Sequence, residues 1–302
     1  MTLRHRIARA LERGVPAAAP LARAWAPISA LALTRPVRRP LREGRVVPVV
    51  CVGGATLGGS GKTRVAIAIA RRLHELGVRV VLVGHAYRAR IAGAQVVPPD
   101  GALATFGDEA LHCARCLAAE VVVGPTRQAA LDHAAQRADV IVLDGPLRVS
   151  GDVLSVLALD EEAPWGSGAI VPAGDLRASR AALLGAADHV VRVPADPVIA
   201  GTLPERFGLF TAIARPARLV RALERRGIRP DAIVSVADHG PLDASARRRL
   251  VPGSTWLATE KCALHLAGLP IAIVSLASAV ELPARLDADL QRVGASPTTG
   301  AP

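Results

Sequence analysis

The sequence predicts an α/β protein with a parallel-sheet domain and a second, smaller α/β domain. From Val46 to Leu276, short apolar runs alternate with helical patterns, as in parallel sheets that are covered on both faces. A Pro-rich stretch at residues 194–204 interrupts this alternation and predicts the domain boundary. Hydrophobic residues make up 51% of the 302 positions, which is enough for a core in both domains.

The elements are expected in a simple order along the chain. Residues 46–198 form the first domain, with strands at 46–52, 78–83, 120–123, 139–143, 153–159 and 189–193 and helices at 63–76, 108–119, 127–137 and 177–186. Residues 199–285 form the smaller domain, with strands at 207–212, 233–236, 255–258 and 271–276 and helices at 216–226, 243–250 and 261–267. We expect the tail, residues 286–302, to be disordered, since it ends in small and polar residues.

Residues 1–45 form a basic, weakly apolar segment ahead of the first strand. They hold ten Arg against two Glu, which is +8 of the net charge of +11. Three Pro and Arg23 interrupt the apolar stretch 15–33. The stretch is therefore not hydrophobic enough for a membrane-spanning helix or a cleaved signal peptide. We expect this segment to lie on an anionic membrane surface, with its large apolar side chains on one side. These side chains are Leu21, Trp25, Ile28, Leu31 and Leu33. A packed N-terminal helix with a solvated basic flank is the alternative.

Composition excludes several kinds of partner. The net charge predicts an anionic ligand, but only 2% of the residues are aromatic, too few for base-stacking platforms. No helix-turn-helix, zinc-finger or ribbon pattern accompanies the Arg-rich start, so nucleic acid is not an expected partner. The four cysteines make no disulfide framework, and Cys113 and Cys116 are interpreted as apolar positions of one helix. We expect a cytoplasmic monomer that is peripheral on the inner membrane.

A glycine-rich loop connects the first strand to the first helix. Its glycines let backbone N–H groups surround phosphate oxygens, and the helix N-terminus adds a positive dipole end. Lys62, one of only two lysines, would reach the β- and γ-phosphates of ATP, and the Thr63 hydroxyl would bind Mg²⁺. The loop residues are Thr56, Leu57, Gly58, Gly59, Ser60, Gly61, Lys62 and Thr63, with Thr56 where the usual pattern has Gly. Asp144, at a strand end, is a candidate Mg²⁺ partner, and an ordinary strand-end Asp is the alternative.

This loop region and four further stretches resemble the tetraacyldisaccharide 4′-kinase family. The four stretches are Gly107-Asp108-Glu109, residues 121–134 with Arg127, residues 168–177 with Arg177, and Thr259-Glu260-Lys261. The resemblance implies an enzyme of lipid A biosynthesis with a P-loop NTPase-like first domain. It would use ATP and Mg²⁺ to phosphorylate the 4′-hydroxyl of a lipid substrate, a tetraacyldisaccharide 1-phosphate.

The resemblance also implies how a sugar hydroxyl would be activated. Asp108 of the GDE motif and His239, where the family has its DHH motif, would form an acid–base pair on opposite domains. Arg177 and Arg127 would neutralise phosphate charge, and a solvated Arg is the alternative at both positions. Glu109 would support the site or serve only as an acidic residue in the first turn of its helix.

The sequence departs from the family pattern at several motifs. Gly54 replaces an Asn ahead of the loop, and only Tyr87 is kept from an SRGYGG motif. The second Asp and the His of a DDGxQH motif are missing after Asp144, and the second His of DHH is Gly240. Cys262 replaces the Asp of a TTEKDA motif. The lost carboxylate puts the handling of Mg²⁺ in question.

Two alternatives to a kinase remain at this point. A degenerate, non-catalytic homologue would bind nucleotide or lipid and regulate another process. A P-loop ATPase of the partitioning or metal-insertion kind is the second alternative. Such loops usually carry a Lys ahead of their Gly pair, where this chain has Leu57.

Overall fold

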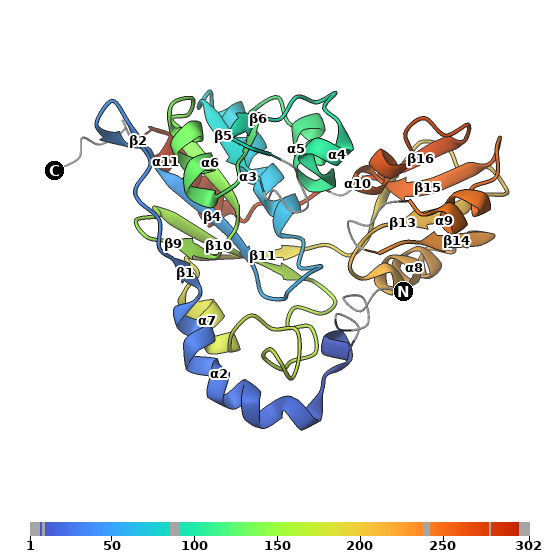
Figure 1. The fold of residues 1–302 in the computed structure, drawn as a ribbon, viewed down its shortest axis with the longest axis horizontal. Helices are drawn as coiled ribbons and strands as arrows, with labels where there is room; N and C mark the ends of the chain where they lie inside the picture. The colour runs from blue at the N-terminus through green and yellow to red at the C-terminus, as the bar shows by residue number, and fades with distance from the viewer. Residues whose placement is uncertain (1–6, 8–9, 85–90, 238–241, 278, 296–302) are drawn as a thin grey trace. The chain divides into compact units, whose positions relative to one another are not determined.

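The chain folds into two compact units, which we call the large unit and the small unit. The structure, a computed structural model, describes residues 7, 10–84, 91–237, 242–277 and 279–295 (Figure 1). The large unit holds the described residues of Arg6–Val193 and Val280–Pro302, and the small unit holds those of Pro194–Ala279. The predicted α/β class is confirmed. The small unit begins ahead of the expected boundary at residue 198 and ends before the expected limit at residue 285.

A seven-stranded sheet forms the centre of the large unit. Its order is β11-β10-β4-β8-β5-β7-β6, and all neighbours are parallel except β6 and β7. The strands are β4 (Val49–Gly54), β5 (Val80–Val83), β6 (Gln95–Val96), β7 (Glu120–Val123), β8 (Val140–Gly145), β10 (Leu154–Asp160) and β11 (His189–Val193). The carboxyl ends of the central strands β4 and β8 lie side by side, because Val52 pairs with Asp144.

Helices cover both faces of this sheet. Successive residues of a strand point to opposite sides, and in the central strands the residues on both sides are buried. Val49 and Cys51 of β4 pack against Ala130 and Leu131 of α6 (Arg127–Ala135). The alternate residues, such as Val50, are also buried, and α3 (Lys62–Glu75) packs against the sheet on that side. The other helices of this part are α4 (Leu103–Phe106), α5 (Asp108–Cys116) and α7 (Arg180–Gly185). Helices α5 and α7 are both shorter than expected. The extended backbone of Leu117 ends α5, and the Ser179 side chain caps the start of α7.

The N-terminal segment is partly built into the large unit, which differs from the separate segment expected for residues 1–45. After η1 (Pro16–Ala18) and α2 (Ala19–Leu31), β1 (Thr34–Arg35) pairs in parallel with β9 (Arg148–Val149). The strands β2 (Leu41–Arg42) and β3 (Arg45–Val46) form an antiparallel pair.

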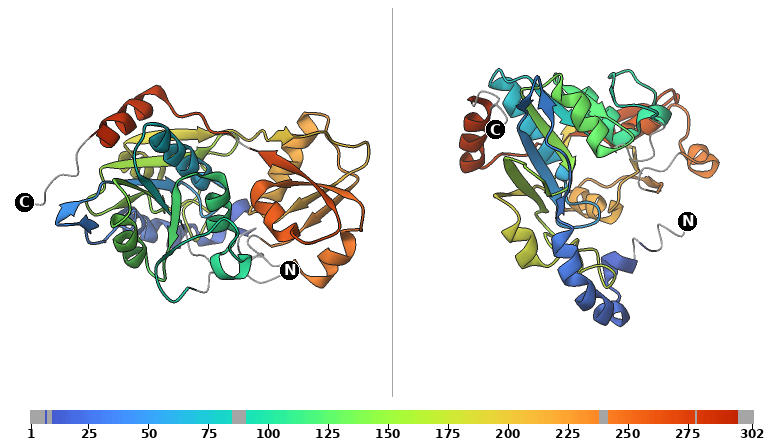
Figure 2. Two further views of the ribbon diagram at one scale, coloured as in Figure 1. Left: turned by 90° about the horizontal axis from the view of Figure 1, so that it is seen from above. Right: turned by 60° about the vertical axis from the view of Figure 1, so that its left-hand side comes forward.

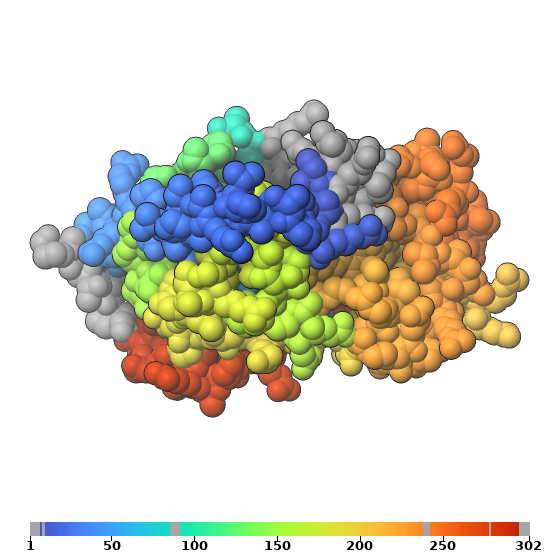
Figure 3. All heavy atoms as spheres, turned by 90° about the horizontal axis from the view of Figure 1, so that it is seen from below, coloured from blue at the N-terminus to red at the C-terminus, as the bar shows by residue number. Residues whose placement is uncertain are grey.

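Helix α2 lies along one face of the large unit, next to the yellow-green residues that precede β11 (Figure 3). Four large apolar side chains of α2 point away from the body of the unit. They are Leu21, Trp25, Ile28 and Leu31, with 66%, 43%, 51% and 80% of their surface exposed. The expectation that Leu33 shares this side is wrong, because Leu33 is buried against Ala55, Leu147 and Leu176. No helix among the described residues is long and apolar enough to cross a membrane.

The small unit holds a five-stranded sheet in the order β12-β16-β15-β13-β14. Only β12 is antiparallel to its neighbour. The strands are β12 (Val198–Ala200), β13 (Gly208–Thr211), β14 (Ala232–Ser235), β15 (Thr255–Thr259) and β16 (Ala272–Ala277), and the helices are α8 (Pro216–Arg225), α9 (Ala244–Arg249), α10 (Glu260–Ala263) and η2 (Leu264–Leu266). Phe210 and Trp256 are buried in its core, so two of the chain's few aromatic residues lie at one place.

The expectation of a disordered tail from residue 286 is wrong for residues 286–295. The chain returns to the large unit and forms α11 (Ala284–Ala295), which packs against α3 (Figure 2). Leu286 and Leu290 are fully buried, and Arg72 of α3 forms an ion pair with Asp287 at 2.5 Å. The sequence analysis gave weight to the polar end of the chain and overlooked the two leucines at helical spacing.

Burial of α11 predicts a stability effect that a disordered tail would not give. We expect Leu290→Ala to lower the free energy of unfolding by about 2–5 kcal/mol, because the substitution leaves a cavity between α11 and α3. Urea unfolding followed by circular dichroism measures this change. The matched control is Leu184→Ala on α7, where 45% of the side chain is exposed and a change below about 0.5 kcal/mol is expected. Equal midpoints for the two variants would contradict the packing of α11.

Candidate nucleotide site at the phosphate loop

The glycine-rich loop runs from the end of β4 to the start of α3, as the sequence predicts. Gly59 and Gly61 have φ of 71° and 77°, a left-handed conformation that side chains other than glycine rarely adopt. Gly61 is the residue ahead of α3, so the first free N–H groups of that helix face the loop. The backbone thus has the form that binds phosphate groups in such loops.

Lys62, Thr63 and Asp144 form one hydrogen-bonded cluster. The Lys62 Nζ lies 3.0 Å from one Asp144 oxygen, and the Thr63 hydroxyl donates to the other oxygen at 2.7 Å. Asp144 is 3% exposed and Lys62 is largely buried. Burial lowers the pKa of Lys62, but the carboxylates of Asp144 and, next, Glu109 outweigh it, so the net shift of this pKa is upward. This upward shift of the pKa favours the charged form of Lys62 at the loop.

Thr56 has a structural role at the position where the usual loop pattern has Gly. Its side chain is buried, and its hydroxyl donates to the Gly58 carbonyl at 2.7 Å. The next residue, Leu57, donates its N–H to the Asp175 carbonyl at 2.9 Å. The first half of the loop is therefore held by the segment around Asp175 rather than by an additional glycine.

Gly54 explains one departure from the family pattern. A Cβ at this position would lie 1.9 Å from the Ser60 Oγ, so a larger residue here requires a different residue or rotamer at position 60. The substitution at Gly54 and the Ser60 side chain are thus two parts of one local packing arrangement within the loop.

The GDE motif lies at the start of α5. Gly107 has a φ of 78°, which turns the chain into the helix, and Asp108 is its first residue. Asp108 is 4% exposed. Glu109 acts on the charge of Lys62, so the motif and the phosphate loop share one electrostatic environment. Glu109 thus lies in the first turn of its helix and also acts on the charge of Lys62, so its supporting role stays a proposal.

Of the two predicted arginines, Arg177 is bonded to the loop. Arg177 donates its backbone N–H to the Ala55 carbonyl and its Nε to the Thr56 carbonyl, each at 2.9 Å. Burial, followed by the positive charge of Arg35, lowers the pKa of Arg177, while Asp144 opposes this shift. Arg127 is the first residue of α6 and follows the capping residue Thr126.

His239, the expected partner of Asp108, lies outside the described residues, and so does Tyr87. Position 262 is described: the Cys262 Sγ accepts the Ala212 N–H at 3.2 Å in the core of the small unit. Cys262 therefore has a packing role in the place where the family has Asp.

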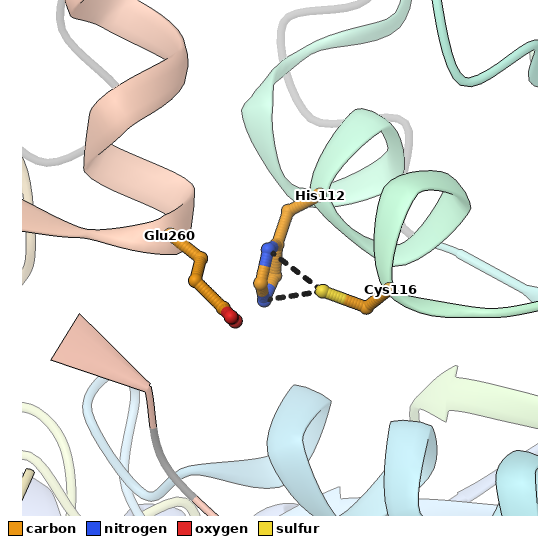
Figure 4. Close-up of side chains that lie close together, drawn as sticks. All are labelled: His112, Cys116 and Glu260. Carbon is orange, nitrogen blue, oxygen red and sulfur yellow. Dashed lines mark hydrogen bonds between the residues drawn. The ribbon is translucent and has the colours of Figure 1, made fainter. Parts of the chain in front are cut away.

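The cysteines of α5 agree with their interpretation as helix positions. Cys113 is 1% exposed, and burial, then the charges of Asp144 and Glu109, raises the pKa of its thiol well above the usual range. One turn apart on the same helix, the Cys116 Sγ lies 3.4 Å from the His112 Nδ1 (Figure 4). The sequence analysis did not note this contact, although a spacing of four residues places both side chains on one face of a helix.

Comparison with known proteins decides the family. The family described as tetraacyldisaccharide-1-P 4′-kinase matches residues 16–202, which is more than half of the chain. The chain belongs to this family. The predicted resemblance is thereby confirmed, and the match begins within the N-terminal segment, ahead of the motifs that carried the resemblance.

Two curated relatives of this kinase family cover most of the chain. The tetraacyldisaccharide 4′-kinase of Methylorubrum extorquens is 34% identical over 294 residues, which cover 85% of this chain and 87% of that protein. The protein of the same name from Azorhizobium caulinodans is 34% identical over 233 residues, which cover 67% and 68%. Among solved structures, LpxK from Aquifex aeolicus, described in complex with ATP, has a TM-score of 0.70 at 20% identity. This match covers 92% of this chain and 98% of that one, and it supports the fold.

Proposed function

We propose that the chain is a tetraacyldisaccharide 4′-kinase, which transfers the γ-phosphate of ATP to the 4′-hydroxyl of a tetraacyldisaccharide 1-phosphate in lipid A biosynthesis. The observation that carries this proposal is the cluster of Lys62, Thr63 and Asp144 at the end of β4 and β8 in a member of this family. The cluster keeps the groups that phosphoryl transfer needs, a cation for the phosphates and oxygen donors beside it.

The residues present also fit a magnesium ion. The Thr63 hydroxyl and the Asp144 carboxylate are hard oxygen donors that lie 2.7 Å apart, beside the loop that would hold the phosphates. We propose that these two residues hold one Mg²⁺ together with the nucleotide, whose bound ion neutralises negative charge on the β- and γ-phosphates. The missing second Asp of the family pattern leaves Asp144 as the carboxylate of this site.

The remaining groups would position the reactants and move the proton. Lys62 binds the phosphates, and the loop N–H groups orient them for in-line transfer. Asp108 accepts the proton of the sugar hydroxyl as part of a pair with His239, a role that is carried over from the family resemblance. A buried carboxylate at a helix start can hold this position without reorganisation when the acceptor binds.

Transfer of radiolabelled phosphate from ATP to a tetraacyldisaccharide 1-phosphate in detergent micelles tests this function. We expect labelled product that depends on both the acceptor and Mg²⁺. Binding of ATP without any labelled product would instead favour the non-catalytic homologue. A rate of ATP hydrolysis that is the same with and without the acceptor would favour an ATPase. NMR of the purified product, through the coupling of the new phosphorus to the sugar-ring protons, distinguishes a phosphate at the 4′ position from one at another hydroxyl.

We further propose that the protein acts as a monomer at the cytoplasmic face of the inner membrane, where its lipid substrate lies. Leu21, Trp25, Ile28 and Leu31 form an exposed apolar stripe on α2, which we call the α2 stripe. Their spacing of three and four residues places them on one helix face. Arg13 and Arg23 add positive charge beside the stripe, which suits an anionic leaflet.

The α2 stripe predicts a specific loss of membrane binding. We expect the double variant Trp25→Ser/Leu31→Ser to bind vesicles containing phosphatidylglycerol at least about tenfold more weakly, because two large apolar side chains no longer enter the interface. Sedimentation with vesicles measures this effect, and added salt should weaken the binding of the unaltered protein. Val251→Ser, which removes an apolar side chain that is 59% exposed in the small unit, is the control. Unchanged sedimentation of the double variant would contradict the proposal.

Deletion of the whole segment is a poorer test, because buried Leu33 would be lost as well.

A further inference from the structure

One side-chain pair outside the phosphate loop has the chemistry of a metal site. His112 and Cys116 lie on α5, four residues apart, which places both side chains on one face of this helix. An imidazole and a thiolate are ligands that Zn²⁺ and similar thiophilic cations prefer. Neither residue has a part in the proposed phosphoryl transfer, so the pair is a candidate for a separate role.

Cys116 is the accessible thiol among the four cysteines, all of which the structure describes. Cys51, Cys113 and Cys262 are buried, whereas Cys116 and the neighbouring His112 are partly exposed. Burial raises the pKa of the Cys113 thiol well above its usual range, so this neighbour stays protonated, while a metal ligand must be a thiolate. Burial thus accounts for three cysteines, and only Cys116 can meet an ion from solvent.

The two ligand atoms already have the separation that a zinc ion imposes. The Cys116 Sγ lies 3.4 Å from the His112 Nδ1 and 3.9 Å from its Nε2 (Figure 4). Zn–S bonds of about 2.3 Å and Zn–N bonds of about 2.0–2.1 Å, at the tetrahedral angle, place sulfur and nitrogen about 3.5–3.6 Å apart. Little movement of either side chain is therefore needed for both to reach one ion.

The end of α5 is held in place by two other segments of the large unit. Arg71 of α3 donates to the Cys116 carbonyl at 3.2 Å, and the Arg115 Nε donates to the Pro99 carbonyl at 2.8 Å. The residue that follows the helix, Leu117, is buried. The backbone that carries both ligands is thus fixed before an ion binds, so little ordering is needed on binding.

We propose that His112 and Cys116 form a site for a thiophilic divalent cation such as Zn²⁺, separate from the Mg²⁺ site proposed at Thr63 and Asp144. The ion takes the place of the thiol proton, which passes to solvent, and water completes its coordination. Sulfur and imidazole ligands disfavour Mg²⁺, which prefers oxygen, so the two sites select different ions. This inference does not depend on the kinase activity, because it concerns binding of the ion alone.

Titration of the tag-free, full-length protein with Co²⁺ tests the site, since a thiolate ligand gives cobalt a charge-transfer band in the near ultraviolet. We expect this band to appear on binding, and Zn²⁺, but not an excess of Mg²⁺, to remove it. Cys116→Ser should abolish the band. His112→Ala should weaken Co²⁺ binding at least about tenfold, because even the loss of an outer hydrogen-bond partner costs a metal site about 10–100-fold in affinity.

Two variants of the same helix are the matched controls. Cys113→Ala removes the neighbouring thiol, which is 1% exposed, and Arg115→Ala removes an exposed side chain next to Cys116. Both should keep the charge-transfer band and the affinity for Co²⁺. Alkylation with iodoacetamide, followed by mass spectrometry, examines the unaltered protein as well. Zn²⁺ should protect Cys116 from this reagent.

Three results would overturn the inference. They are a band that persists in Cys116→Ser, a band that is lost in Cys113→Ala, and an equal Co²⁺ affinity of His112→Ala and the unaltered protein. Equal alkylation of Cys116 with and without Zn²⁺ would also overturn it, and this measurement holds even where a variant fails to fold. Failure of the proposed function is a separate result, since these assays contain neither ATP nor a lipid acceptor.

Discussion

Lys62→Ala is expected to lower kcat for phosphoryl transfer by at least roughly 10³-fold. Lys62 is the ammonium of the phosphate loop, its charge is secured by Asp144, and no other Lys belongs to the large unit. Lys62→Arg is expected to fail almost as badly. A guanidinium fork is wider than an ammonium and does not fit between the loop and Asp144. Initial rates of label transfer at saturating ATP and acceptor measure both variants.

Two controls make this result specific. Arg71→Ala removes an exposed cation from the same helix and should leave kcat unchanged. The thermal transition of Lys62→Ala should be recorded as well, because the substitution leaves buried Asp144 without its ion-pair partner. A folded Lys62→Ala variant with nearly full turnover would remove the basis for assigning the loop to nucleotide.

The second large effect concerns Asp108 and His239. If they share one proton path, Asp108→Asn and His239→Ala should each lower kcat by about 10²–10⁴-fold, and the double variant should lose little more. Residues that act as a unit are strongly non-additive. The affinity for ATP should change little in all three variants, which a fluorescent ATP analogue can measure.

A pH profile tests which of the two groups accepts the proton. The acidic limb of kcat should disappear in His239→Ala, since a protonated imidazole can no longer switch the base off. His74→Ala, at an exposed position on α3, is the control and should keep the limb. Independent, additive losses would mean that the two residues act separately. Full activity of His239→Ala would end the proposed pairing.

The geometry of the candidate nucleotide site was predictable from the sequence because its signal is local. The glycine-rich loop, Lys62 and Thr63 are consecutive, and a strand followed by a helix fixes their geometry whatever the rest of the chain does. Asp144 was predictable for a related reason, since parallel strands end at one edge of a sheet. The resemblance to a family then supplied the acceptor, which no local pattern in the loop specifies.

Helix α11 was not predicted, because it depends on contacts between distant residues. Leu286 and Leu290 look like isolated leucines in a polar tail until α3 provides the surface that buries them. Long-range packing of this kind leaves little trace in composition or periodicity.

The contact between Lys62 and Asp144 has a consequence for how nucleotide enters. Each of the two groups has an opposite charge at 3.0 Å, and the Thr63 hydroxyl donates to the second carboxylate oxygen. Asp144 thus competes with a bound nucleotide for contacts with Lys62 and Thr63. Binding becomes an exchange reaction, in which one set of charge contacts replaces another and the net gain is smaller than the sum of the new contacts.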